Sequence, residues 1–223
     1  MDYRLVDVSM WLDDFTFPGD QPVEITGPFN FVSGANPEYV HHLATPTQAG
    51  THVQGPRYFV PDGDTIDTFP LDRFEGPVVL VDMPGRGVDL SLSELRSALA
   101  GRQLAGQVLL FRSGHMERVI ASGVLEPGDR PGLSLEAARW LAADSGVRMI
   151  AIDSVGVESR TTSDFDVNVL LCHAGILILE GLVNLDALGP GPLWLEAFPL
   201  KVRGVEGTPC RAVVKDYSGV GSR

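Results

Sequence analysis

The chain has 223 residues, five His and two Cys, and its 17 Lys and Arg against 29 Asp and Glu give a formal net charge of −12. Hydrophobic residues make up 44% of the chain, enough for a sizeable core, which excludes intrinsic disorder, a collagen-like repeat and a disulfide-stapled scaffold. The acidic balance and the lack of a Lys/Arg cluster argue against nucleic acid as the main partner. A small molecule is therefore the expected partner.

The number of cysteines and the sequence of the N-terminus indicate in which cellular compartment the chain is expected. Cys172 in an apolar run and Cys210 in a polar segment are too few for a C-x-x-C zinc site or a disulfide framework, so a reducing cytoplasm is expected. The first residues lack the basic start and apolar core of a signal peptide, and no stretch reaches the roughly 20 apolar residues of a membrane span. We therefore expect a cytoplasmic chain that does not bind membranes.

The N-terminal part of the chain predicts short strands separated by turns. Residues 5–9 alternate between apolar and polar side chains, and residues 17–20 (FPGD) are typical of a turn. Gly27-Pro28 and Asn36-Pro37 are expected to break the chain again. These signals predict a β-rich N-terminal part.

After residue 76, strands alternate with helices. Three continuous apolar runs of strand length are typical of strands covered on both faces: residues 77–82, 107–112 and 147–153. Two helices are expected between them, each opening on a Ser cap, at residues 91–100 and 134–144. A short helix at residues 169–174, ended by Gly175, precedes a further strand at residues 176–182. The order of these elements indicates an α/β fold.

The segment from Gln48 to Phe59 is the most informative in the chain. Gly50-Thr51-His52 at a strand gives the backbone room beside a ligand. Because side chains alternate along a strand, His52 and Gln54 fall on the same face. Alone, this pattern fits a packed core histidine better than a catalytic one.

The chain resembles the cyclase family, which includes bacterial kynurenine formamidase and isatin hydrolase. The family motif H-x-G-T-H-x-D-x-P-x-H is matched as Gln48-x-Gly50-Thr51-His52-x-Gln54-x-Pro56-x-Tyr58. Further matches follow in order at residues 6–9, 17–20, 62–66, 131–134, 150–153 and 177–185. The resemblance implies a swivelling β/β/α fold of α/β class, with a mixed sheet, as one domain over residues 1–223. It also implies a homodimer or homotetramer.

The resemblance further implies a metal site that this sequence has largely lost. Relatives hold one or two divalent metals, commonly zinc or manganese, at the positions occupied here by Gln48, His52, Gln54, Tyr58, Asn168 and Glu180. Only His52 and Glu180 keep metal-binding side chains, whereas a catalytic zinc takes about three protein ligands. We therefore expect no metal cofactor. Zinc or manganese held by the reduced ligand set is the alternative.

These substitutions lead to a hypothesis of acid–base catalysis without a metal. His52 or Glu180 would move the proton, while Gln48, Gln54, Tyr58 or Asn168 holds the oxygen on which charge develops. Loss or addition of water beside a carbonyl of a small biosynthetic intermediate is favoured, because hydrolysis loses the metal that activates water. Two alternatives stay open: a metal-dependent amide or lactone hydrolase of the kynurenine formamidase type, and a ligand-binding protein without activity.

Several other residues are weaker candidates for the pocket. His41 and His42 lie in a predicted strand, so their rings point to opposite faces and one can line the pocket. His115 follows a predicted strand end and is a candidate substrate contact, while Cys172 is expected to be a buried, inert thiol. The aromatic candidates for the pocket wall are Trp11, Phe15, Phe29 and Phe31.

Overall fold

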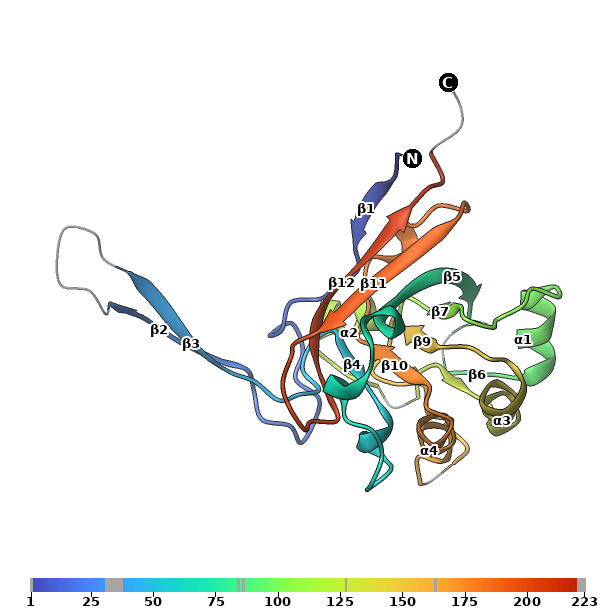
Figure 1. Ribbon diagram of the computed structural model, residues 1–223, viewed down its shortest axis with the longest axis horizontal. Coiled ribbons are helices and arrows are strands. Elements are labelled where there is room, and N and C mark those ends of the chain that lie inside the picture. The colour runs from blue at the N-terminus through green and yellow to red at the C-terminus, as the bar shows by residue number, and fades with distance from the viewer. Residues whose placement is uncertain are drawn as a thin grey trace.

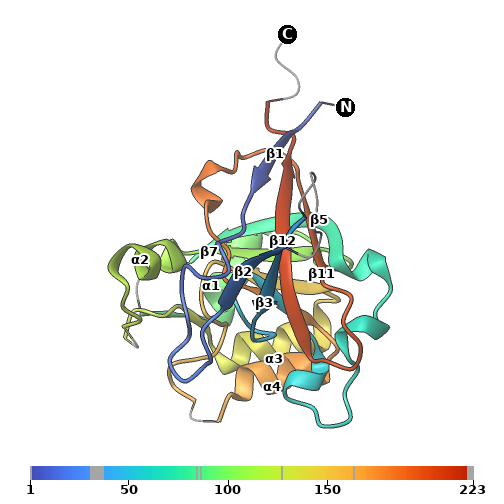
Figure 2. The ribbon, with the colours of Figure 1, turned by 90° about the vertical axis from the view of Figure 1, so that its left-hand side faces the viewer.

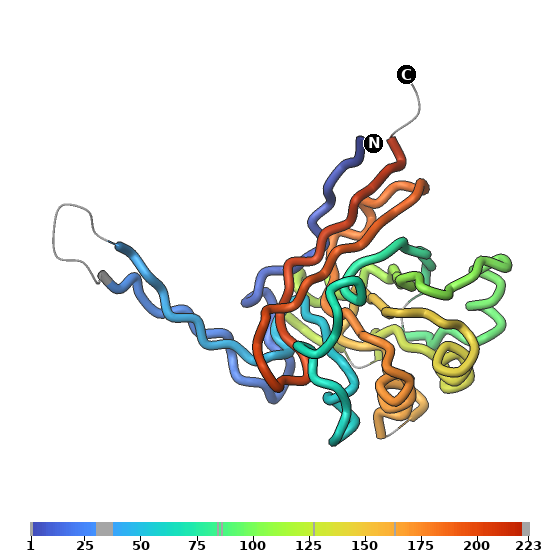
Figure 3. Tube along the Cα trace, in the orientation of Figure 1, coloured from blue at the N-terminus to red at the C-terminus, as the bar shows by residue number. Residues whose placement is uncertain are grey.

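The structure is a computed structural model that describes residues 2–30, 38–83, 85, 87–126, 128–162 and 164–219. Figure 1 and the tube in Figure 3 show an α/β body from which a two-stranded hairpin projects to one side. The expected break at Asn36-Pro37 lies outside the described residues, as does Phe31. In the described part of the chain, no helix is long and apolar enough to cross a membrane.

A mixed eight-stranded sheet forms the centre of the body, in the order β1-β12-β11-β5-β7-β9-β10-β4. Strands β5, β7, β9 and β10 are parallel neighbours, and β12 pairs with β4 as well as with β11, so the sheet closes on itself. The strands are β1 (Arg4–Asp7), β4 (His52–Gln54), β5 (Glu75–Asp82), β7 (Val108–Arg112), β9 (Met149–Ile152), β10 (Leu177–Glu180), β11 (Leu193–Pro199) and β12 (Gly207–Asp216).

The alternation of side chains along the strands divides the interior into two cores. Val108 and Leu110 belong to a cluster with residues of β4, β9, β10, β11 and β12, which fills the inside of the closed sheet. Leu109 and Phe111 belong to the other cluster, under the helices that cover the outer face. These helices are α1 (Leu92–Leu99), α3 (Leu135–Asp144) and α4 (Asp166–His173). The predicted buried strands are therefore covered on both faces.

The predicted starts of the first two helices are confirmed. Ser91 accepts from the Glu94 backbone while the Glu94 side chain accepts from the Ser91 backbone, which is a complete capping box for α1. The Ser134 side chain caps α3 by accepting from the Ala137 backbone, without the reciprocal bond of a capping box. The helix at residues 169–174 is longer than expected and begins at Asp166, after which the chain returns as β10.

Helix α2 (His115–Ser122) and the C-terminal strands β11 and β12 were not predicted. Gly114 precedes α2 in a left-handed conformation and has no side chain to cap the helix, so the usual start signal at the N-cap is missing. The remaining short elements are the strand pair β6 (Asp89–Leu90) and β8 (Gly132–Leu133) and the 3₁₀ turns η1 (Pro56–Tyr58), η2 (Ile66–Thr68), η3 (Leu71–Phe74) and η4 (Leu185–Ala187).

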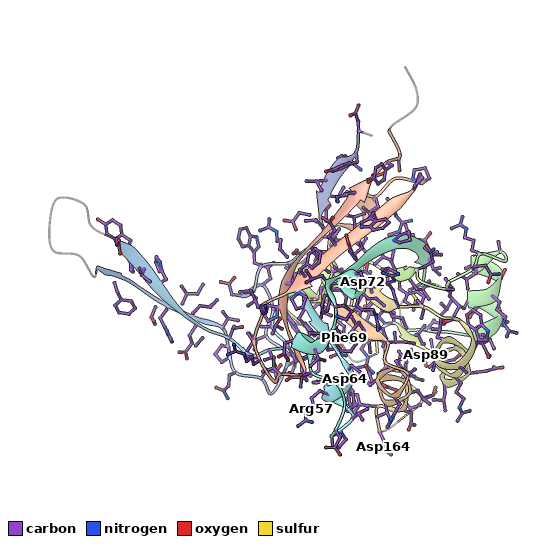
Figure 4. The ribbon with its side chains drawn as sticks, in the orientation of Figure 1. Arg57, Asp64, Phe69, Asp72, Asp89 and Asp164 are labelled. Atoms are coloured by element: carbon purple, nitrogen blue, oxygen red, sulfur yellow. The ribbon has the colours of Figure 1, made fainter. Side chains whose placement is uncertain are left out.

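Strands β2 (Glu24–Asn30) and β3 (Tyr39–Ala44) form the projecting hairpin, called the arm below. Figure 2 views the molecule from the side of the arm, and Figure 4 shows its side chains standing clear of the rest of the described chain. Gly27-Pro28 does not break the chain as expected but lies within β2, where the register with β3 shifts between Thr26 and Phe29. A bulge absorbs the residues that cannot continue a regular ladder.

Candidate active site

A cavity of about 410 Å³ lies where strands β9 and β10 end. Carboxyl ends of parallel strands are the usual place for a ligand in open α/β sheets, because the loops that follow the strands meet there. Its apolar wall consists of Met10, Phe15, Phe17, Phe59, Met116 and Phe165. Its polar side chains include all six positions at which the family resemblance implies metal ligands: Gln48, His52, Gln54, Tyr58, Asn168 and Glu180. The predicted site is therefore brought together in one place.

The register between β4 and β10 explains why His52 and Glu180 meet. The two strands are antiparallel, with His52 directly opposite Glu180 and Gln54 opposite Ile178. Side chains of directly opposed residues lie on the same face of the sheet. The intervening Val53 is fully buried in the core inside the closed sheet. The expectation that residues 52 and 54 share a face is confirmed.

His52 and Glu180 form a close, buried pair. The Nε2 atom of His52 lies 3.5 Å from Oε2 of Glu180, and both side chains are almost completely shielded from solvent. Nδ1 of His52 lies 2.9 Å from the Gly50 carbonyl oxygen, which can only accept, so Nδ1 carries a proton. The backbone thereby turns Nε2 towards the carboxylate of Glu180.

Gln54 and Tyr58 flank this pair. The Gln54 amide donates to Oε1 of Glu180 at 3.4 Å, and its buried oxygen has no hydrogen-bond partner among the described residues. Burial, and after it the negative charge of Glu180, raises the pKa of Tyr58, so its hydroxyl stays protonated and can donate at neutral pH. That ring packs edge-on against Phe59.

The remaining two amides each hold a carboxylate that the sequence did not single out. Gln48 donates to Glu206 at 2.9 Å, and Asn168 donates to Glu158 at 2.8 Å. Glu158 also accepts from the backbone of Val167 and Asn168, so it satisfies the N-terminus of α4. No sequence spacing indicates either carboxylate, because both reach the site from loops.

The side chains at the family's metal positions do not form a conventional metal site. Within the described residues, no group of three or more His, Cys, Asp or Glu is placed to hold a metal ion. His52 and Glu180 supply two donors, while the amide nitrogens of Gln48 and Asn168 face carboxylates. A catalytic zinc needs about three nitrogen, sulfur or carboxylate ligands, so this donor set does not fit one.

Three predicted substrate contacts lie away from the cavity. Phe29 and His42 stand on the arm, and Trp11 is 75% exposed at the surface, so none of them lines the cavity of its own chain. Of the aromatic candidates for the wall, Phe15 lines it. Alternation placed His42 on one face of a strand, but alternation cannot tell whether that strand belongs to the body or to an arm.

His115 and Cys172 are both buried and take no part in the cavity surface. His115 contacts the Ser154 hydroxyl through Nδ1 at 2.8 Å, and burial, followed by the charge of Arg118, lowers its pKa to about 4. Burial raises the pKa of the Cys172 thiol to about 12, as expected for an inert cysteine. Both cysteines are free, in agreement with the absence of a disulfide framework.

Comparisons with known proteins agree with this architecture. The Cyclase family model matches residues 6–159, more than half of the chain. The chain belongs to the cyclase family. As a member of the family, it is 30% identical to kynurenine formamidase of Salinibacter ruber over 95% of this chain and 97% of that protein. It is 32% identical to kynurenine formamidase of Paracidovorax citrulli, over 89% of each.

Two solved structures share the fold. Isatin hydrolase A from Ralstonia solanacearum superposes with a TM-score of 0.81 at 24% identity, over 96% of this chain and 92% of that one. A protein described as a predicted metal-dependent hydrolase from Bacillus stearothermophilus gives a TM-score of 0.76 at 23% identity, over 97% of this chain and all of that one (100%). The α/β fold with a mixed sheet is thereby confirmed.

Proposed function

We propose that this chain hydrolyses a small amide or lactone and that His52 and Glu180 together act as the base. The observation that carries the proposal is the buried pair, with Nε2 and Oε2 3.5 Å apart at the cavity. The names of the relatives support hydrolysis, since they are formamidases and isatin hydrolases. None of these relatives is named for the loss or addition of water that the sequence favoured.

The pair can hold and activate one water molecule. In the neutral imidazole that carries its proton on Nδ1, towards the Gly50 carbonyl, Nε2 is an acceptor, as is the ionised carboxylate of Glu180. Two acceptors 3.5 Å apart can each take one hydrogen of a water placed about 2.8 Å from both. Such a water is oriented with its lone pair towards the cavity, where a substrate carbonyl would lie.

The reaction then balances with groups of this chain alone. The pair takes a proton from the water as its oxygen forms a bond to the carbonyl carbon, and the electrons of the double bond move to the carbonyl oxygen. The protonated hydroxyl of Tyr58 donates to that oxygen. Collapse of this intermediate breaks the bond to the leaving nitrogen or oxygen, which receives the proton from the pair.

Without a full set of metal ligands, the reactivity of the substrate carbonyl must come from the substrate itself. A metal would polarise the carbonyl and lower the pKa of water, and the donor set of this chain does not fit one. The substrate must therefore carry an activated carbonyl, such as a formamide, a cyclic imide or a strained lactone. The proposal is thus metal-independent hydrolysis of an activated amide or lactone.

The His52→Gln variant tests the role of the pair. Glutamine keeps a polar side chain but cannot take a proton, so kcat/KM on a panel of formanilides and lactones should fall by about 100-fold or more. His173→Gln is the matched control, because His173 is exposed at the end of α4, outside the cavity. Near-normal turnover by His52→Gln would contradict the proposal.

A further inference from the structure

Arg130 lies in the cavity wall, two residues before β8, and was not singled out by the sequence. The adjoining strand fixes its position. The Leu133 backbone donates to the Val157 carbonyl at 3.0 Å, and a side chain at Gly132 would collide with the Glu158 carbonyl. Residues 156 and 158 of that segment also line the cavity. Arg130 is therefore anchored at the cavity by packed backbone.

The guanidinium of Arg130 differs from those of the other half-buried arginines. Within the described residues, Arg73, Arg112, Arg118 and Arg148 each donate to a carbonyl or a carboxylate. Arg130 is equally half-buried but makes no hydrogen bond or ion pair with the described part of the chain. An unpaired guanidinium in such a place loses hydration without gaining a partner, so a bound anion would stabilise it.

The carboxylates that line the same cavity do not supply that partner. Glu180 lies beside His52 and accepts from Gln54, Glu158 accepts from Asn168 and the start of α4, and neither carboxylate forms an ion pair with Arg130. Asp20 lies on an exposed turn and forms no ion pair with Arg130. Among the described residues, the cavity therefore offers one unpaired guanidinium, from a segment of the chain separate from those that supply the proposed base.

We infer that Arg130 binds a carboxylate carried by the substrate. This inference rests on the proposed function for the reacting group but names a separate contact. A guanidinium matches a carboxylate through two parallel N–H···O bonds, which gives orientation as well as affinity. With the carboxylate held by Arg130, the reacting carbonyl is left to face His52 and Glu180. The substrate class is thus a small carboxylate-bearing amide or lactone.

Calorimetric binding of benzoate and of neutral benzamide to the full chain tests this contact without requiring turnover. The wild type should bind benzoate the more tightly, and Arg130→Gln should weaken benzoate by about 10- to 100-fold while leaving benzamide unchanged. Arg130→Lys should keep part of the preference. Arg139→Gln, at an exposed position of α3, is the matched control and should bind both probes as the wild type does.

Equal binding of the two probes by the wild type, or unchanged benzoate binding by Arg130→Gln, would overturn the inference. Rates on formanilide and its 2-carboxy derivative separate this outcome from a failure of the proposed function. Hydrolysis of both compounds at equal rates, unaffected by Arg130→Gln, would overturn the carboxylate contact and leave the hydrolase intact. Arg130-dependent binding without any hydrolysis would support the contact and overturn the proposed function.

Discussion

The carboxamides of Gln48, Gln54 and Asn168 each donate to a carboxylate, at Glu206, Glu180 and Glu158 respectively. All three amides occupy positions where the family resemblance implies metal ligands. In a metal site, a cation would compensate the negative charge of such carboxylates. Here hydrogen bonds from neutral amides take over part of that role, which keeps the cavity polar.

Restoring family ligands should restore metal binding. The combined variant Gln48→His and Gln54→Asp, together with the native His52 and Glu180, presents four ionisable donors at the positions of the motif. We expect close to one zinc per chain after dialysis, measured by elemental analysis, and a zinc-dependent rise in the melting temperature. Gln54→Asn is the control and should bind no more zinc than the wild type. A combined variant that folds but takes up no extra zinc would contradict this assignment of positions.

At the level of elements, the site depends on short strands placed by the closed sheet. The helix-then-strand order was predicted for residues 169–182 from Gly175 and the apolar run that follows it. The structure has this order at residues 166–180, which brings Asn168 and Glu180 to the same cavity. The pairing of β4 with β10 was not predicted. A strand as short as His52–Gln54 carries no local signal for its partner, because register depends on the whole sheet.

Asp216, at the end of β12, links this strand to Arg4 of β1 and to the Gly189 backbone by hydrogen bonds. Burial alone would raise its pKa, but hydrogen bonds from Ser218, Arg4 and the Gly189 backbone outweigh burial and hold the pKa well below the usual value. Because the folded-state pKa lies below the unfolded value, the stabilisation is present above about pH 4 and is lost as pH falls towards the folded-state pKa.

Replacement of this carboxylate should therefore destabilise the fold in a pH-dependent way. At pH 7, Asp216→Asn should lower the free energy of unfolding by about 1–3 kcal/mol, because it breaks the ion pair with Arg4 and leaves buried donors poorly matched. In urea titrations the difference should shrink at pH 3. Asp62→Asn, at an exposed position, should change stability little at either pH. A difference for Asp216→Asn that is unchanged or larger at pH 3 would contradict this account.

At the scale of the whole molecule, the cavity is assembled from segments far apart in the chain. Residues 10–23, 46–59, 116–130 and 155–181 all contribute to its lining. The motif and the apolar periodicity predicted the α/β class and the central polar residues. They could not find Arg130, Glu158 or Glu206, because each reaches the site from a loop whose position depends on tertiary packing.

The expected homodimer or homotetramer remains a prediction. The arm is the surface at which we expect the subunits to contact each other. Ile25 and Leu43 face each other across β2 and β3 and are 58% and 46% exposed. A lone two-stranded ribbon is marginally stable in water, and exposed apolar pairs are typical of contact surfaces.

Sedimentation velocity should show that the wild type is an oligomer and that the double variant Ile25→Asp, Leu43→Asp dissociates. Leu71→Asp, at a site that is 71% exposed on the body, is the control. A wild-type monomer at micromolar concentration would contradict the prediction.

The central claim is that His52 and Glu180 support hydrolysis without a metal. The most direct test measures the hydrolysis rate of a formanilide or lactone substrate and the metal content on the same chelator-treated sample. We expect an undiminished rate with far less than one metal ion per chain, and no gain when zinc or manganese is added back. A rate that vanishes on chelation and returns in proportion to bound metal would contradict it.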